Sequence, residues 1–94
     1  MIHMHDMTTM TLLQVSAVVE GSERLADEIG RAGVTPQRFT EVVKEALDKR
    51  LKELRSIPNI TDVSYAPILR RRQIVYGRLS ALVTTYNAIN GRSR

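Results

Sequence analysis

Apolar residues recur at steps of three and four along most of this chain, the period of one face of an α-helix. The first such run spans residues 12–31. Thr11 precedes it and Gln14 lies in its first turn, a spacing that is typical of a capping box. Its apolar side consists of Leu12, Val15, Val19, Ser22, Ala26 and Ile29, widened by Val18 and Leu25. Gly21 costs a helix about 1 kcal/mol relative to alanine, so two shorter helices, the second capped by Ser22, are an alternative.

A second helix is predicted to begin at Thr35-Pro36, because threonine caps helix N-termini and proline suits the first helical position. It ends at residues 56–59, where Pro58 excludes its predecessor from the helical region. One side is apolar and consists of Phe39, Val42, Val43, Ala46, Leu47, Leu51 and Leu54. The opposite side is charged.

The last helix is predicted to begin between Ser64 and Pro67 and to run to Ile89, with Asn90-Gly91 as its end. Its apolar residues follow a 4-3-4-3 spacing that is typical of a coiled-coil-like packing face. They are Val75, Leu79, Leu82, Tyr86 and Ile89, and Ile74 and Val83 are expected to extend the same face.

The predicted fold is therefore all-α, either a small three-helix bundle or a long helical hairpin with an extra N-terminal helix. Residues 1–10 have no apolar period and are predicted to form a flexible tail, which leaves residues 11–94 as one helical domain. The two long apolar rows exceed what so short a chain ordinarily buries alone, so we expect a homodimer.

Candidate chemistry is sparse. The chain has no cysteine, which excludes disulfides, thiolate-bound zinc and a thiol nucleophile. His3 could bind copper or nickel together with a free amino terminus, but we expect His3 and His5 to be tail residues without a metal. No nucleotide-binding, zinc-protease or serine-hydrolase motif occurs, so we expect neither enzymatic activity nor a cofactor. The absence of a long apolar run or secretory signal predicts a cytoplasmic protein without membrane contact.

Charge is distributed unevenly. Residues 1–34 carry five acids and two bases, whereas residues 65–94 carry six arginines and no acid. The run Arg70-Arg71-Arg72 is expected either to contact an anionic partner or to pair with the acidic residues of the first helix. Three consecutive helical positions spread over about 200°, so at least one arginine should lie against the chain's own acidic first helix, and Arg72 is the candidate.

Two tyrosines on the last helix complete the candidate surface. Tyr86 belongs to the apolar row and is expected in the core with its hydroxyl at the rim. Tyr76 lies beside Arg72 and is either a binding hot spot or a half-buried packing residue. The residues predicted to bind a protein partner are Arg70, Arg71, Tyr76, Arg78, Leu79, Val83 and Tyr86.

Two stretches carry a family resemblance over about residues 33–90. Gly33-Val34-Thr35-Pro36 precedes apolar positions at Phe39, Val42 and Ala46-Leu47, and Ser80-Ala81-Leu82 is followed by Thr84. Both stretches resemble the small helical quorum-sensing antiactivators of rhizobia and agrobacteria, the TraM-like family. This chain departs from the family in its shorter inter-helix link and its more basic last helix. The resemblance implies a cytoplasmic dimer that sequesters a LuxR-type transcriptional activator and blocks its binding to DNA.

Two other functions fit the same pattern. One is a small basic DNA-binding or nucleoid-type protein that uses the arginine-rich helix. It is less favoured, because no helix-turn-helix is evident and no aromatic residues are interleaved with the basic ones. The other is a helical structural or chaperone module of a secretion system or phage particle.

Overall fold

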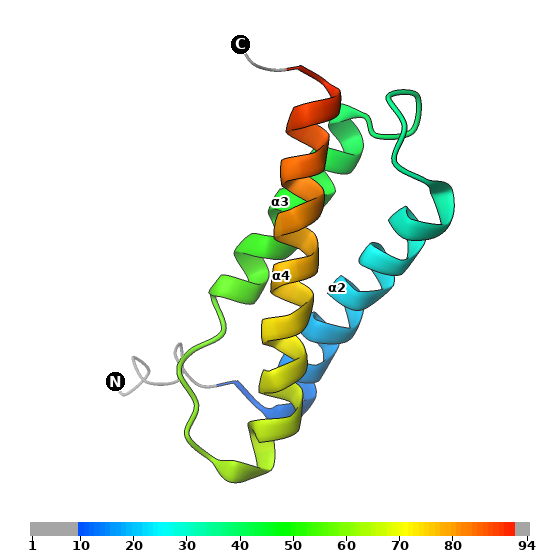
Figure 1. Ribbon diagram of the computed structural model, residues 1–94. Helices are drawn as coiled ribbons and strands as arrows, with labels where there is room; N and C mark the ends of the chain where they lie inside the picture. Colours follow the sequence, from blue (N-terminus) through cyan, green and yellow to red (C-terminus); the bar gives the residue numbers. More distant parts are fainter. Residues whose placement is uncertain (1–9, 92–94) are drawn as a thin grey trace.

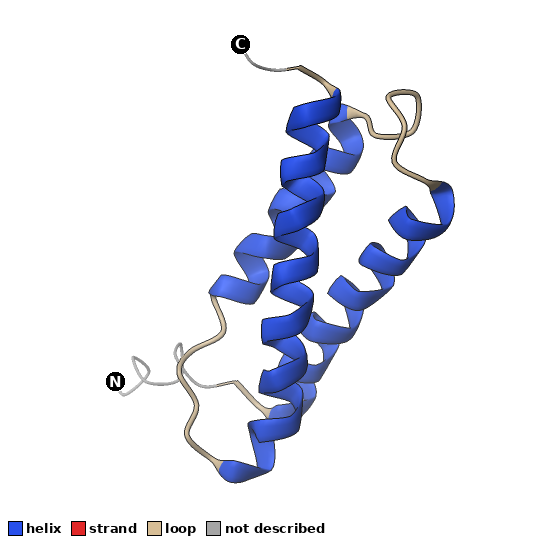
Figure 2. Ribbon diagram, viewed as in Figure 1, coloured by secondary structure: helices blue, strands red, loops and turns tan. Residues whose placement is uncertain are grey.

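The computed structural model describes residues 10–91, in which three long helices pack together (Figures 1 and 2). They are α2 (Leu12–Ala32), α3 (Glu41–Arg55) and α4 (Ala66–Ile89), and a short 3-10 turn, η1 (Val63–Tyr65), leads into α4. The predicted all-α fold is confirmed, in its three-helix form. The tail prediction for residues 1–9 lies outside the described residues. Met10, however, packs against the core, and its carbonyl accepts a hydrogen bond from the Tyr65 hydroxyl at 3.0 Å.

Helix α2 begins with the predicted capping box. The backbone N–H of Gln14 donates to Thr11 Oγ1 at 3.1 Å, and the backbone N–H of Thr11 donates to Gln14 Oε1 at 2.8 Å. The alternative break at Gly21 does not occur. Ser22, which would have capped a second helix, donates instead to the Val18 carbonyl within the same helix at 3.0 Å. Gly33 ends α2 at a φ of 91°, where glycine is favoured.

The predicted start of α3 at Thr35-Pro36 is wrong. The segment forms a single turn, in which the Phe39 N–H donates to the Thr35 carbonyl at 2.7 Å. Thr40 is then extended, with a ψ of 174°, and the helix begins at Glu41. The break has a packing reason, because it lets Phe39 turn into the core, where only 1% of it is exposed.

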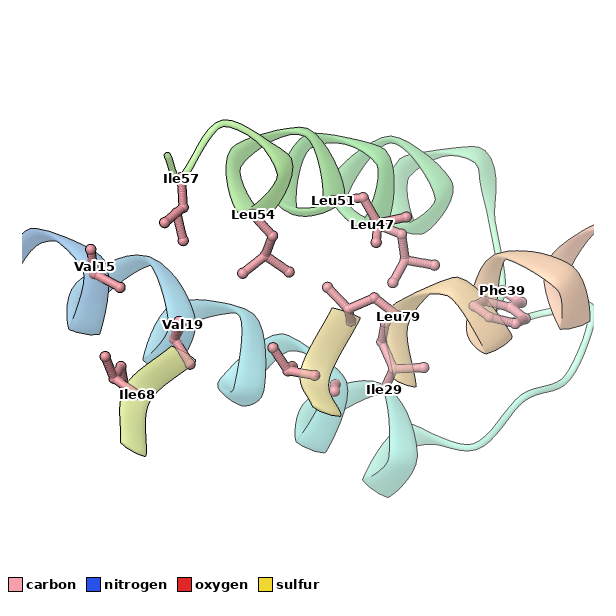
Figure 3. Packing of buried hydrophobic residues seen from close by; sticks show 12 residues of the cluster. Val15, Val19, Ile29, Phe39, Leu47, Leu51, Leu54, Ile57, Ile68 and Leu79 are labelled. Atoms are coloured by element: carbon pink, nitrogen blue, oxygen red, sulfur yellow. The ribbon is translucent and has the colours of Figure 1, made fainter. Parts of the chain in front are cut away.

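The core lies where α4 crosses α2 and α3. Ile68, Val75 and Leu79 of α4 are buried against residues of both other helices (Figure 3). The remaining buried apolar residues are Val15, Val19, Ala26, Ile29, Phe39, Leu47, Leu51, Leu54 and Ile57. Leu82, Tyr86 and Ile89 are partly buried against this core, and so is Val83. The apolar row of α4 and the apolar side of α3 therefore cover each other within one chain.

Two apolar residues predicted on these faces are exposed. Val42 is 74% exposed and Ile74 is 60% exposed. At about 100° per residue, Val42 lies some 140° around α3 from Leu47, and Ile74 lies 100° around α4 from Val75. Both side chains therefore point away from the helices that bury Leu47 and Val75.

The molecule is flat and elongated. Its Cα atoms extend over 47 × 27 × 16 Å, with a radius of gyration of 15.4 Å. A compact domain of this size would have a radius of gyration of about 12 Å. Helix α4 lies over α2 and α3 and crosses both, and the Ala32 end of α2 lies away from α4 (Figure 1). The thickness of 16 Å corresponds to two layers of helix backbone, so the pair α2 and α3 has only one covered side.

Two glycines in helix interiors allow a matched stability test. A Cβ at Gly21 would lie 2.9 Å from Arg50 Nη1, whereas a Cβ at Gly77 would have no neighbour within 4 Å. Gly77→Ala should raise the free energy of unfolding by about 0.5–1 kcal/mol through backbone entropy. Gly21→Ala should gain less, because the Arg50 guanidinium must move. Urea denaturation measures both, and equal gains would show that Arg50 does not rest on Gly21.

The turn before α4 predicts a pH effect. The Asp62 carboxylate accepts hydrogen bonds from the Ser64 N–H and hydroxyl, both at 2.9 Å, and these bonds lower its pKa. Its contribution to stability is therefore complete above the ordinary carboxyl pKa of about 3.9 and is lost as the pH falls through the lowered value. Asp62→Ala should lower the melting temperature at pH 7 but not at about pH 2. A difference of the same size at both pH values would contradict this role.

Candidate protein-binding groove

Two of the arginines predicted to bind a partner instead join α4 to α2. Arg71 holds Glu23 through two hydrogen bonds, from Nη2 to Oε1 at 2.6 Å and from Nε to Oε2 at 3.1 Å. The hydrogen bonding to Glu23 raises the pKa of Arg71. About two turns further along α4, Arg78 Nη2 contacts Asp27 Oδ1 at 3.0 Å. The basic last helix and the acidic first helix therefore neutralise each other along their contact.

Arg72 does not face α2, and the prediction that it would is wrong. Its Nε donates to the Leu54 carbonyl in the last turn of α3 at 3.0 Å. Position 72 lies about 100° around the helix from Arg71, on the other side of the buried Val75 row. There it adds a hydrogen bond to a carbonyl at the helix C-terminus that also accepts from the Ile57 N–H at 3.3 Å. Arg70 is exposed, and its side chain makes no hydrogen bond or ion pair within residues 10–91.

The other predicted partner-binding residues also belong to the bundle. The ring of Tyr86 packs edge-on against Phe39, with centroids 5.6 Å apart, and its hydroxyl donates to Glu41 Oε1 at 2.8 Å. The Tyr76 hydroxyl accepts from Arg55 Nη1 at 3.2 Å, and the side chain is half-buried, as the packing alternative expects. Leu79 is completely buried and Val83 half-buried. Only Arg70, among the predicted set, is exposed and unpaired within the described residues.

A different surface lies on the side of α2 and α3 that faces away from α4. Two adjoining hollows, of about 220 and 280 Å³, are lined entirely by α2, α3 and the segment between them. Leu25 and Glu28 line both, so the hollows form one continuous depression, which we call the α2–α3 groove. It extends from Gly21 to Gly33, about 18 Å or three turns along α2.

The floor of the groove is apolar. In the first hollow it consists of Leu25, Ile29, Phe39 and Val43, and in the second it continues at Ala46 and Gly21. The floor side chains are small at the Gly21 and Ala46 end and large at the end formed by Ile29, Phe39 and Val43. The guanidinium of Arg50 lies against Gly21 and closes the small end.

The rim of the groove is mainly basic. Arg24, Lys49 and Arg50 line the second hollow, and Arg38 lines the first. Glu28 is the one acid among the lining residues of the two hollows. Arg50 is paired with Glu53 at 3.0 Å, whereas the other three cations have no ion pair within residues 10–91.

Sequence reasoning missed this surface. Leu25 and Val43 were predicted only as members of apolar helix sides, and no binding role was predicted for Arg24, Arg38 or Lys49. The signal was the width of the apolar side of α2, which is greater than contact with a single helix requires. The extra width indicates a surface outside the core only when the position of α4 is known.

Comparison of the chain with protein-family models, with curated proteins and with solved structures found no match. Within residues 10–91, no helix combines the length and apolar content that a membrane crossing requires. The same part of the chain contains no group of three or more His, Cys, Asp or Glu side chains arranged to hold a metal ion. His3 and His5 lie outside it. The function proposed below therefore rests on the chain's own residues.

The arginine run offers a matched pair of substitutions. Arg71→Glu places a carboxylate beside Glu23 and should lower the melting temperature by a few degrees, because a cross-helix pair becomes a repulsion. Arg70→Glu makes the same change of charge one residue earlier, without a partner, and should leave the melting temperature nearly unchanged. Thermal denaturation followed by circular dichroism compares the two. Equal melting temperatures would mean that the Glu23 contact does not stabilise the fold.

Proposed function

We propose that this protein regulates another protein by binding it, as an antiactivator that holds a LuxR-type transcriptional activator away from its DNA. The α2–α3 groove is the observation that carries the proposal. It consists of two adjoining hollows, of which the first is lined mainly by apolar side chains and the second mainly by charged ones. A concave surface that combines an apolar part with a few charged groups is typical of a binding site.

Exposed apolar residues continue beyond the floor of the groove. Val42 shares a helix face with Ala46, four positions away, and is 74% exposed. Val34 follows Gly33, which lines the first hollow, and is 44% exposed. Their exposure would be costly to maintain without a use, and both would be buried by a protein segment seated over the first hollow.

The choice of an activator as the partner comes from the family resemblance. Gly33 and Phe39, two of the residues on which the resemblance rests, line the first hollow. The segment Gly33-Val34-Thr35-Pro36 therefore has a structural place next to the proposed binding surface. The cytoplasmic location that such a function requires is part of the same proposal.

The DNA-binding alternative receives less support from the geometry. Arg71, Arg72 and Arg78 are bound to Glu23, the Leu54 carbonyl and Asp27, so the arginine-rich helix does not present a row of unpaired cations. A phosphate backbone would have to displace these internal partners before it could be bound.

Homodimerisation is also part of the proposal, but on a different surface from the one expected. The two long apolar rows are used within the chain, which leaves the outward side of α4 around the exposed Ile74 as the candidate contact. A dimer through that side would keep the α2–α3 groove of each subunit accessible.

Co-expression with a LuxR-type activator and a promoter fusion that it drives tests the proposal. Reporter output should fall when this protein is present, because the captured activator cannot occupy its promoter. Ala46→Tyr fills the groove and should restore the output, whereas Ala66→Tyr makes the same change in the exposed first turn of α4, about two turns from Ile74, and should not. Circular dichroism verifies that both variants fold. Unchanged reporter output with the unmodified protein would contradict the antiactivator proposal.

A further inference from the structure

We infer that the α2–α3 groove binds an amphipathic helix of about three turns whose flanks are acidic. The inference rests on the proposed function only in that the protein binds another protein. It adds the chemical class of the segment that is bound, which neither the family resemblance nor the arginine run indicates.

The shape of the groove favours a helix. Helix α4 packs along one side of the α2 and α3 pair, and the groove follows the opposite side over about 18 Å. A helix seated there would complete a four-helix bundle, with the new helix and α4 on opposite sides of the pair. Recognition of this kind uses apolar side chains spaced at i, i+3, i+4 and i+7, which the apolar floor can receive in successive turns.

The size of the floor residues sets an orientation. The Ala46 and Gly21 end has small side chains, and a large anchor such as leucine or phenylalanine fits there once the Arg50 guanidinium, which lies against Gly21, moves aside. The opposite end, formed by Phe39, Ile29 and Val43, is already filled by large side chains and suits smaller apolar residues. The bound helix should therefore be bulkier at one end than at the other.

The positive charge of the groove's rim favours acidic residues on the flanks of the bound helix. Arg24 comes from α2, Lys49 from α3 and Arg38 from the segment before α3, so cations flank the floor on both sides and at one end. None of the three has an ion pair within residues 10–91, whereas Arg71 and Arg78 on α4 each have one. Carboxylates beside the apolar anchors would supply the missing partners, and lysines there would be repelled.

The same charge argues against a second copy of this chain as the occupant. A symmetric contact through the groove would place its basic rim against an identical basic rim. The acidic α2 cannot easily serve as the bound helix of another copy, because Glu23 and Asp27 are already held by Arg71 and Arg78. An acidic helix of another protein would bring no basic rim against the groove, and its carboxylates would not be held by Arg71 and Arg78.

Two synthetic helical peptides test the inference. Both have about 14 residues and leucine at i, i+3, i+4, i+7 and i+11, but one has glutamates and the other lysines beside the leucines. Fluorescence anisotropy with the full chain should show saturable binding of the glutamate peptide and at least about tenfold weaker binding of the lysine peptide. The affinity of the glutamate peptide should fall as salt is raised. Equal affinities for the two peptides would overturn the charge selection.

Substitutions on α3 locate the binding. Lys49 lines the groove, so Lys49→Glu should weaken binding of the glutamate peptide about tenfold. Lys52 is an exposed cation one turn further along the same helix that lines neither hollow, so Lys52→Glu should have a clearly smaller effect. Ala46→Tyr should abolish binding. Loss of affinity in Lys52→Glu equal to that in Lys49→Glu would place the peptide elsewhere and overturn the inference.

The remaining outcomes separate this inference from the proposed function. If neither peptide binds, the inference is wrong. Sedimentation then tests whether a second copy of the chain fills the groove. In that case the protein sediments as a dimer, and the Ala46→Tyr variant sediments as a monomer. Reporter repression that survives in Lys49→Glu would keep the antiactivator function and reject the acidic helix. Peptide binding without repression would support the acidic helix and reject the activator as the partner.

Discussion

The burial of one side of α4 against two helices at once is the contact on which the rest of this bundle depends. Ile68, Val75 and Leu79 supply the apolar part of it. Polar contacts follow on both sides, with Arg71 reaching α2 and Arg72 reaching the end of α3. Because α4 packs against both α2 and α3, it fixes how these two helices stand relative to each other, and thereby the shape of the α2–α3 groove on the other side.

The helices and most of their ends could be predicted because their signals are local. The Thr11 and Gln14 capping box and the proline in the first turn of α4 act within a few residues, and both occur as expected. Thr35-Pro36 is also a genuine local signal, since a turn does form there. It fails as a helix start because burying Phe39 outweighs five more residues of helix. That comparison involves the whole core and cannot be made from neighbouring residues.

The candidate site could be predicted only in part, for a geometric reason. The spread of three adjacent arginines correctly requires that some of them face the chain itself. Which of them does so depends on the rotation of α4 about its axis, and Arg71 meets a residue 48 positions away in the sequence. The groove is harder still to foresee, because its floor residues are ordinary members of apolar helix sides. They become a site only because α4 covers a different side of the pair.

The order of the helices along the chain has a consequence for how the protein is made. Helix α4 is the last of the three to leave the ribosome, and it is the one that holds the other two together. Until it emerges, α2 and α3 have little buried surface in common, and their leucines and valines stay open to water. A chain that ends before α4 therefore exposes apolar side chains of α2 and α3 that the complete bundle buries. The core can form only when the final helix packs against both of its predecessors.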